Sequence, residues 1–271
     1  MPLLFLITFW LTACDDDSLA SICDNHPELC SDITRISDCG YKRTHLIRAR
    51  YYAKKEPSNK TTLALMDKLT QYETCLEKKM HIQYSKNKTR NKQRMNNYLA
   101  TQKSMQTILD KNKKSKDPHI AYHLWTEDND KNAKKTFMAA ATDKNSRDAD
   151  LVSKLASSYA DHSPKKALRE YYRALRISTS LDALEADVFS NIMMIYYKQS
   201  DFENAYIWAL IANKVDKEGE DIDIDIDIDI EMIIHKGLKS NPQTIDNKTK
   251  LRDTAMRYLD ELEDGTFKDK P

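Results

Sequence analysis

The sequence predicts an all-α protein in which a disulfide-stapled helical hairpin precedes a short solenoid of helix pairs. Three observations lead to this fold class. Glycine is scarce, with 4 residues, and proline is modest, with 7 residues in 271, so a turn-dense β fold is not expected. Hydrophobic residues make up 40% and charged residues 31%, which suits helices that each bury one apolar stripe. A helix–turn–helix pattern also recurs in the second half. The net charge of +1 provides no overall field that would steer the chain to nucleic acid.

Residues 1–13 form an expected leader. Its apolar stretch, residues 3–10, is shorter than the roughly 20 apolar residues that span a bilayer. It is followed by Leu11-Thr12-Ala13-Cys14, which resembles the lipobox of bacterial lipoproteins. The alternative is an ordinary apolar strand.

The lipobox resemblance implies that the leader is removed and that Cys14 carries fatty acyl chains such as palmitate, which anchor the chain in a lipid bilayer. The expected location is the bacterial cell envelope, facing the periplasm. Asp15, directly after the acylated cysteine, favours the inner membrane.

Residues 14–85 hold four more cysteines, Cys23, Cys30, Cys39 and Cys75. In an exported chain an even number of cysteines predicts disulfides, and four cysteines allow three pairings. Residues 41–55 and 61–83 both have a helical pattern and are separated by a turn, so a hairpin favours pairing Cys39 with Cys75. Cys23 and Cys30 would then close a small loop. A zinc site is the alternative, but the spacings of 6, 8 and 35 intervening residues contain no C-x2-C knuckle.

Residues 86–116 are expected to be a basic connector. Residues 78–116 contain 12 Lys or Arg and one acid, Asp110. Such a run is typical of a solvated, partly disordered segment. It could instead contact anionic phospholipid close to the anchor or an acidic partner.

Residues 117–215 contain three segments that each have the pattern of a helix, a short polar turn and a second helix, offset by 34 and then 38 residues. The second helices carry small and aromatic residues at i, i+4 and i+7, and the first helices carry a small residue in two units. These expected packing residues are Ala133, Phe137 and Ala140; Ala167, Tyr171 and Ala174; Ala205, Ala209 and Ala212; and Ala121 and Ala156.

This period resembles the tetratricopeptide repeat, and the third unit also resembles the Sel1-type repeat. The resemblance implies helix pairs that stack into a superhelix with a concave surface. Met193 is large where the repeat usually has a small residue, so the repeats are degenerate. The alternative is core packing in a simple α-bundle.

Two further segments follow the repeats. Residues 216–231 form an acidic tract with five Asp-Ile dipeptides, read as a repetitive expansion of a loop. A calcium loop is not supported, because Ile226 and Met232 occupy the positions that require glycine and glutamate. Residues 232–271 are expected to form a capping helix, at about 249–263, and a tail.

Few residues suggest chemistry. His119 and His123 share one helix face, but no glutamate follows the first histidine and no third ligand is evident. No glycine-rich phosphate loop, nucleophile elbow or paired-carboxylate site stands out. We therefore expect no catalytic residue, no metal and no cofactor, and a protein that is not an enzyme.

Nearly the full mature chain resembles an uncharacterised family of Gram-negative bacterial lipoproteins (domain of unknown function 2989). The resemblance rests on Cys14, the cysteines from Cys23 to Cys39, residues 44–51, Cys75 and residues 117–125. It supports location and architecture and implies no activity.

Helix-pair arrays commonly bind other proteins, so the expected function is a scaffold of the cell envelope. Its expected partners are the bilayer, through acylated Cys14, and an unknown envelope protein, with no nucleic acid. The alternative is a sensor that binds a metal or small molecule through His119, His123 and the acidic tract. Candidate groove residues on the first helices are Tyr122, His123, Ser157, Ser158, Asn191 and Met194.

Overall fold

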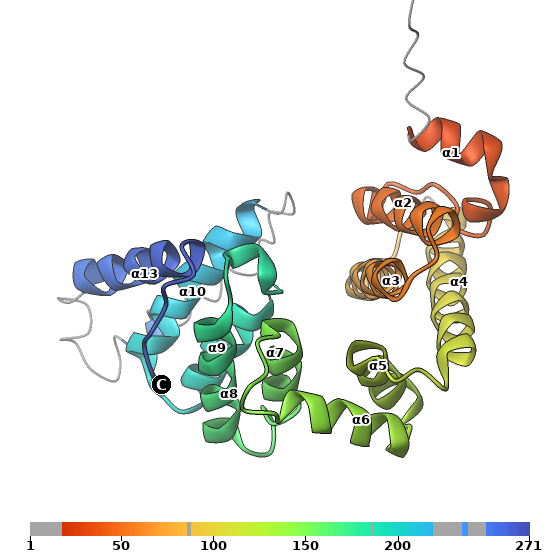
Figure 1. Cartoon of the computed structure of the whole chain (residues 1–271). Coiled ribbons are helices and arrows are strands. Elements are labelled where there is room, and N and C mark those ends of the chain that lie inside the picture. Colours follow the sequence, from red (N-terminus) through yellow and green to blue (C-terminus); the bar gives the residue numbers. More distant parts are fainter. Residues whose placement is uncertain (1–17, 86–87, 186, 219–234, 238–247) are drawn as a thin grey trace, which may run out of the picture. The chain divides into compact units, whose positions relative to one another are not determined.

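A computed structural model describes residues 18–85, 88–185, 187–218, 235–237 and 248–271, and these residues form helices and no strand (Figure 1). The expected all-α fold class is therefore confirmed. Cys14, Asp15 and the Asp-Ile tract lie outside the described residues. The chain divides into two compact units, Met1–Asp128 and Asn129–Pro271, which we call the N-terminal unit and the C-terminal unit. This division falls inside the first expected helix pair, rather than at residue 117.

The N-terminal unit is built around a helical hairpin. Helix α2 packs against α3, α3 packs against α4, and α5 contacts both α3 and α4, while α1 and a 3-10 turn, η1, contact α2. A capping box starts α3, because Ser58 Oγ accepts from the Thr61 N–H (3.1 Å) and Thr61 Oγ1 accepts from the Ser58 N–H (3.0 Å). The elements are α1 (Leu19–Asn25), η1 (Pro27–Leu29), α2 (Gly40–Lys55), α3 (Asn59–Lys79), α4 (Lys88–Asn112) and α5 (Pro118–Asp128).

Two disulfides staple this unit, and their pairing is the one that the hairpin favours. Cys39 at the start of α2 bonds to Cys75 late in α3, with 6.0 Å between the Cα atoms. Cys23 of α1 bonds to Cys30 directly after η1. The hairpin interior beneath them is apolar, with Leu46, Tyr72 and Leu76 fully buried.

The expected basic connector is largely a helix, so that prediction was wrong for this segment. Helix α4 covers Lys88–Asn112 and packs on α3. Its buried residues recur at helical spacing, but the first three are polar. The buried stripe therefore lacks the apolar periodicity that predicts a helix from sequence. The buried residues are Arg94, Asn97, Thr101, Met105 and Leu109.

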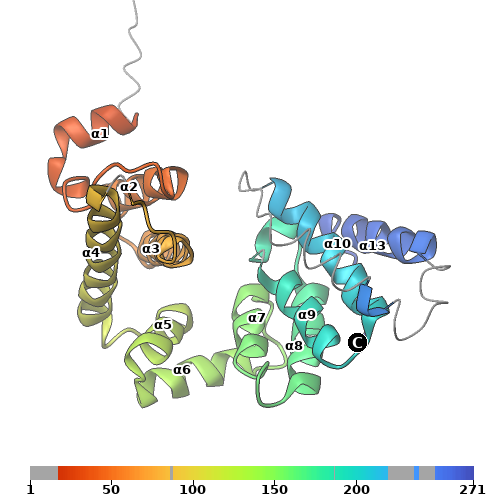
Figure 2. The same cartoon turned by 180° about the vertical axis from the view of Figure 1, so that it is seen from behind.

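The C-terminal unit is a series of packed helix pairs. Helix α6 contacts α7, α7 packs against α8, α8 contacts α9, and α9 packs against α10 (Figures 1 and 2). The last helix, α13, packs on α10. The elements are α6 (Lys131–Ala141), α7 (Ala149–Ser157), α8 (Pro164–Ile177), η2 (Leu181–Ala183), α9 (Asp187–Lys198), α10 (Phe202–Glu218) and α13 (Lys248–Glu263).

Small and aromatic side chains fill the space between these helices. The expected packing positions are buried, with one exception: Ala140 is half-buried, and the fully buried residue of α6 at that end is Ala141. The buried set is Ala121 in the N-terminal unit and Ala133, Phe137, Ala156, Ala167, Tyr171, Ala174, Ala205, Ala209 and Ala212 in the C-terminal unit.

Trp208 of α10 is fully buried in the hydrophobic core of the C-terminal unit. Its indole N–H donates to Tyr172 Oη (3.1 Å), and that hydroxyl lies 3.1 Å from Tyr196 Oη. Tyr258 of α13 contacts the indole ring, with 5.6 Å between ring centroids. The terminal helix thus shares one aromatic cluster with the helix pairs.

Candidate functional site

The candidate site lies in the N-terminal unit, beside the loop that joins η1 to α2. Side chains from three helices fix this loop, residues 31–39. The Asn97 amide of α4 accepts from the Thr34 N–H (2.8 Å) and donates to the Thr34 carbonyl (2.8 Å). Arg50 of α2 forms a bidentate pair with Asp32 (2.6 and 2.9 Å). The Cys39–Cys75 disulfide ties the end of the loop to α3.

Asp38 anchors the same loop to the basic helix α4. Its buried carboxylate accepts from Arg90 Nε (3.0 Å) and Tyr84 Oη (3.1 Å), and Arg94 Nη1 lies at 3.4 Å. Burial alone would raise the pKa of Asp38, but the hydrogen bonds from Arg90 and Tyr84 and the charges of both arginines outweigh it and lower the pKa. The positive charge of α4 therefore serves in part to hold an acidic loop residue.

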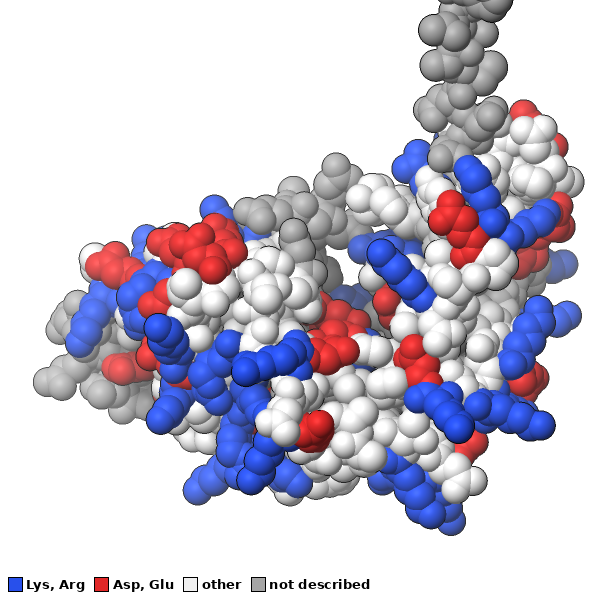
Figure 3. Space-filling model, in the orientation of Figure 1, with Lys and Arg blue, Asp and Glu red and all other residues white. Residues whose placement is uncertain are grey.

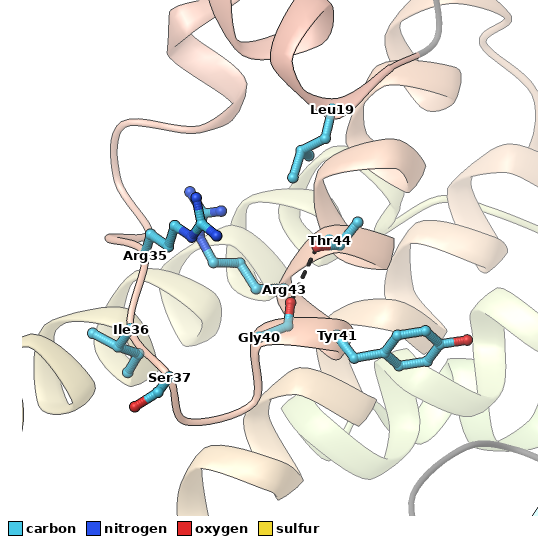
Figure 4. Close-up of a pocket in the computed structure, with 8 residues that line it drawn as sticks. All are labelled: Leu19, Arg35, Ile36, Ser37, Gly40, Tyr41, Arg43 and Thr44. Carbon is cyan, nitrogen blue, oxygen red and sulfur yellow. Dashed lines mark hydrogen bonds between the residues drawn. The ribbon is translucent and has the colours of Figure 1, made fainter.

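A pocket of about 640 Å³ opens beside this loop (Figure 4). Leu19 of α1, residues 35–37 of the loop, and Gly40, Tyr41, Arg43 and Thr44 of α2 line it. Its volume is in the range of small-molecule sites, roughly 300 to 1,000 Å³. Its lining includes two arginines and no carboxylate.

Arg35 and Arg43 approach the pocket from different elements, and Figure 4 shows their guanidinium groups directed to the same region. Arg35 is exposed, whereas Arg43 is 9% exposed and its Nε donates to the Ile33 carbonyl (2.8 Å). Burial lowers the pKa of Arg43, Tyr72 and Asp32 oppose this shift, and the nearby charges of Arg35 and Arg50 add to it. Two like charges thus lie near one another at the pocket.

The helix start that lines the pocket adds further donors. The N-cap residue of α2, Cys39, has φ 57° and makes no side-chain capping bond, and the first turn holds no acid. The first N–H groups of a helix have no intrahelical acceptor and carry partial positive charge. The pocket is therefore suited to an anion.

The histidines expected on one helix face are in different environments. His123 is buried, and its Nε2 lies 3.8 Å from Asp67 Oδ1 of α3. His119 is half-buried in the first turn of α5, where the Asp117 carboxylate accepts its backbone N–H (2.9 Å). A buried His123 fits core packing better than open coordination, and it also fits poorly as a groove residue.

The other expected groove residues are at least partly accessible. Ser157 of α7 and Met194 of α9 are exposed, and Tyr122, Ser158 and Asn191 are half-buried. Figure 3 shows Lys and Arg interspersed with Asp and Glu on the visible face of the molecule.

Sequence reasoning missed the pocket arginines. A signal was available in the stretch around Arg35, Cys39, Gly40 and Arg43, where basic residues flank a helix start that lacks a capping acid. What the sequence does not reveal is that the nearby acids, Asp32 and Asp38, are already paired with arginines from distant positions.

Fold and site together define a disulfide-stapled, all-helical protein with a basic pocket beside its N-terminal hairpin. The chain belongs to the family of proteins of unknown function DUF2989, whose family model matches residues 11–210. Neither the curated proteins nor the solved structures contain a significant match. Among the described residues, no helix combines the length and apolar character needed to cross a membrane.

Proposed function

We propose that this protein is a lipid-anchored lipoprotein of the bacterial cell envelope that faces the periplasm and acts as a scaffold for another envelope protein. The observation that carries the location is the pair of disulfides, Cys23–Cys30 and Cys39–Cys75. Such bonds persist in oxidising compartments and are rare in the cytosol. The disulfides therefore support export of the chain. Export in turn supports the interpretation of the segment before Cys14 as a lipobox.

The scaffold role is supported by the packing of the C-terminal unit. Successive helix pairs, α7 with α8 and α9 with α10, contact their neighbours through buried alanines and aromatics. This packing supports the interpretation of the segment as degenerate tetratricopeptide-like repeats, a class whose stacked repeats form extended concave binding surfaces. Met194 on α9 is a large apolar residue that is 36% exposed, which suits a contact with a partner.

Site-specific crosslinking in cells tests the scaffold. A photo-reactive residue replaces Met194 on α9, and a matched control replaces Met256 on α13, which is 45% exposed. We expect a discrete adduct, identified by mass spectrometry as an envelope protein, from position 194 and not from position 256. Background adducts only, or the same adducts from both positions, would contradict the proposal.

Mass spectrometry of the mature protein tests the anchor separately. We expect a chain that begins at Cys14 and carries a mass increment for its acyl groups. Cys14→Ala should release the protein from the membrane fraction into the soluble periplasm or leave the leader uncleaved. A wild-type chain that retains residues 1–13 without acylation would rule out the anchor.

A further inference from the structure

The lining of the pocket beside α2 is positively charged. It includes Arg35 and Arg43 and no acid. The nearby carboxylates are already engaged, since Asp32 pairs with Arg50 and Asp38 pairs with Arg90 and Arg94. An external anion would complete the charge balance at the pocket.

Arg43 is the more buried of the two pocket arginines. Its side chain is 9% exposed, and its Nε donates to the Ile33 carbonyl. Figure 4 shows the rest of its guanidinium group directed to the same region as that of Arg35. A guanidinium has five N–H donors, and a buried charge is costly unless it is paired.

We propose that this pocket binds a phosphate group, and that the phosphate belongs to the head group of an anionic phospholipid. Arginine is suited to phosphate because its planar donors match two phosphate oxygens at once. The uncapped start of α2 supplies further donors at the same place, as helix N-termini do for phosphates in other proteins.

A lipid is the favoured source because of where the pocket lies along the chain. Leu19, on the pocket wall, is five residues from Cys14. Five residues reach at most about 17 Å, so an acylated Cys14 would keep the pocket close to the head groups. Leu19 and Ile36 give the pocket an apolar side, and Tyr41, 45% exposed, is a residue type enriched at membrane interfaces. This choice of source rests on the proposed lipid anchor, whereas the phosphate site itself does not.

Isothermal titration calorimetry of the full chain, with Cys14→Ser to prevent acylation, tests the site. The probes are dihexanoyl phosphatidylglycerol below its micelle concentration, and inorganic phosphate. We expect saturable one-to-one binding of the phosphatidylglycerol and much weaker binding of inorganic phosphate. Arg35→Ala should weaken the lipid affinity about tenfold, the usual effect of losing one charged hydrogen-bond partner.

Gly40→Asp provides a second variant that should fold. A Cβ at Gly40 meets no atom within 4 Å, and an acid in the first turn favours the helix. Its carboxylate should occupy the pocket and abolish binding without loss of helical content. Arg48→Ala is the matched control, because Arg48 is an exposed arginine of α2 outside the pocket lining, and it should leave the affinity unchanged.

Each result bears on the proposal. Failure of both probes to bind, or equal weakening by Arg48→Ala and Arg35→Ala, would overturn it. Tight binding of inorganic phosphate without the lipid would overturn the lipid source and leave a site for a soluble phosphate. Because the titration needs neither an anchor nor a partner protein, its failure is distinct from failure of the scaffold or the acylation test.

Discussion

Buried arginines in the N-terminal unit bind carboxylates and backbone carbonyls from distant parts of the chain. Arg50 is 9% exposed and binds Asp32 and the Leu29 carbonyl, which fixes the turn before the loop. Arg94 is 1% exposed and donates to the Ile82 carbonyl (2.5 Å) while facing Asp38. Such groups are stable in a protein interior only while their partners remain, because an unpaired buried charge is poorly solvated.

Asp38→Ala should therefore be strongly destabilising. The substitution leaves Arg94 buried without its carboxylate, a situation that typically costs about 3–5 kcal/mol. Urea unfolding, followed by hydrogen exchange of peptides from the N-terminal unit, measures the loss. Asp24→Ala is the control, since Asp24 is exposed, and its effect should stay within about 0.5 kcal/mol. A loss for Asp38→Ala as small as the control's would show that the pair is dispensable.

The pH dependence of Asp38 has a definite sign. Its pKa in the folded protein lies below the ordinary value of 3.8, so the unfolded chain binds this proton more tightly. The contribution of Asp38 to stability is thus complete above about pH 4 and is lost as the pH falls through the folded pKa. The stability difference between wild type and Asp38→Asn should shrink from pH 7 to pH 3 in urea titrations. A stability difference that stays constant with pH would show that the negative charge of Asp38 does not contribute to the stability of the folded protein.

At the scale of the element, helix contact in the C-terminal unit depends on small residues. Ala174 of α8 is fully buried among the packed pairs. Ala174→Leu should destabilise the unit by about 1–3 kcal/mol, because added methylenes in a filled core force neighbours apart. Ala139→Leu on α6, at an exposed position, is the matched control and should be nearly neutral. The midpoint of thermal unfolding should distinguish the two variants. Equal shifts would mean that the core around Ala174 can accommodate a larger side chain.

The two disulfides should differ in what they contribute. Cys39 and Cys75 are 36 residues apart, whereas Cys23 and Cys30 are 7 apart. In the chain-entropy account the longer loop stabilises by about 4 kcal/mol and the shorter by about 2.5 kcal/mol. Urea unfolding of Cys39→Ser/Cys75→Ser should therefore show the greater loss compared with Cys23→Ser/Cys30→Ser. The reverse order would indicate that the N-terminal turn is the structurally limiting element.

Elements with local signals were predictable from sequence, and those that depend on distant partners were not. The hairpin of α2 and α3 follows from its periodicity and turn, and it favours the pairing of Cys39 with Cys75 that the structure contains. Helix α4 is not predicted because its buried stripe begins with the polar residues Arg94, Asn97 and Thr101. Of these, Arg94 and Asn97 bind partners elsewhere in the chain. The pocket is not predicted for the same reason. Its charge depends on which nearby acids form ion pairs with arginines from distant positions.

At the scale of the whole molecule, the division of the chain shows what a repeat pattern does and does not specify. The pattern in residues 117–215 identified small and aromatic positions that are buried. It also grouped α5 with α6, yet α5 packs on α3 and α4 and belongs to the N-terminal unit. A periodic apolar face predicts that one side of a helix will be buried. It does not predict which other helix packs against that side, because this depends on the shapes of the neighbouring helices.

The two units should respond differently to reduction. Both disulfides lie in the N-terminal unit, and the described part of the C-terminal unit contains no cysteine. Dithiothreitol removes the constraint on the unfolded N-terminal unit and so lowers its stability, whereas the aromatic core around Trp208 keeps all its contacts. Calorimetric scans of the full chain should show one thermal transition that falls by several degrees on reduction and one that stays within about 1 °C. A common shift of all unfolding would mean that the units unfold as one cooperative body, in which case the hairpin's staples also stabilise the helix pairs.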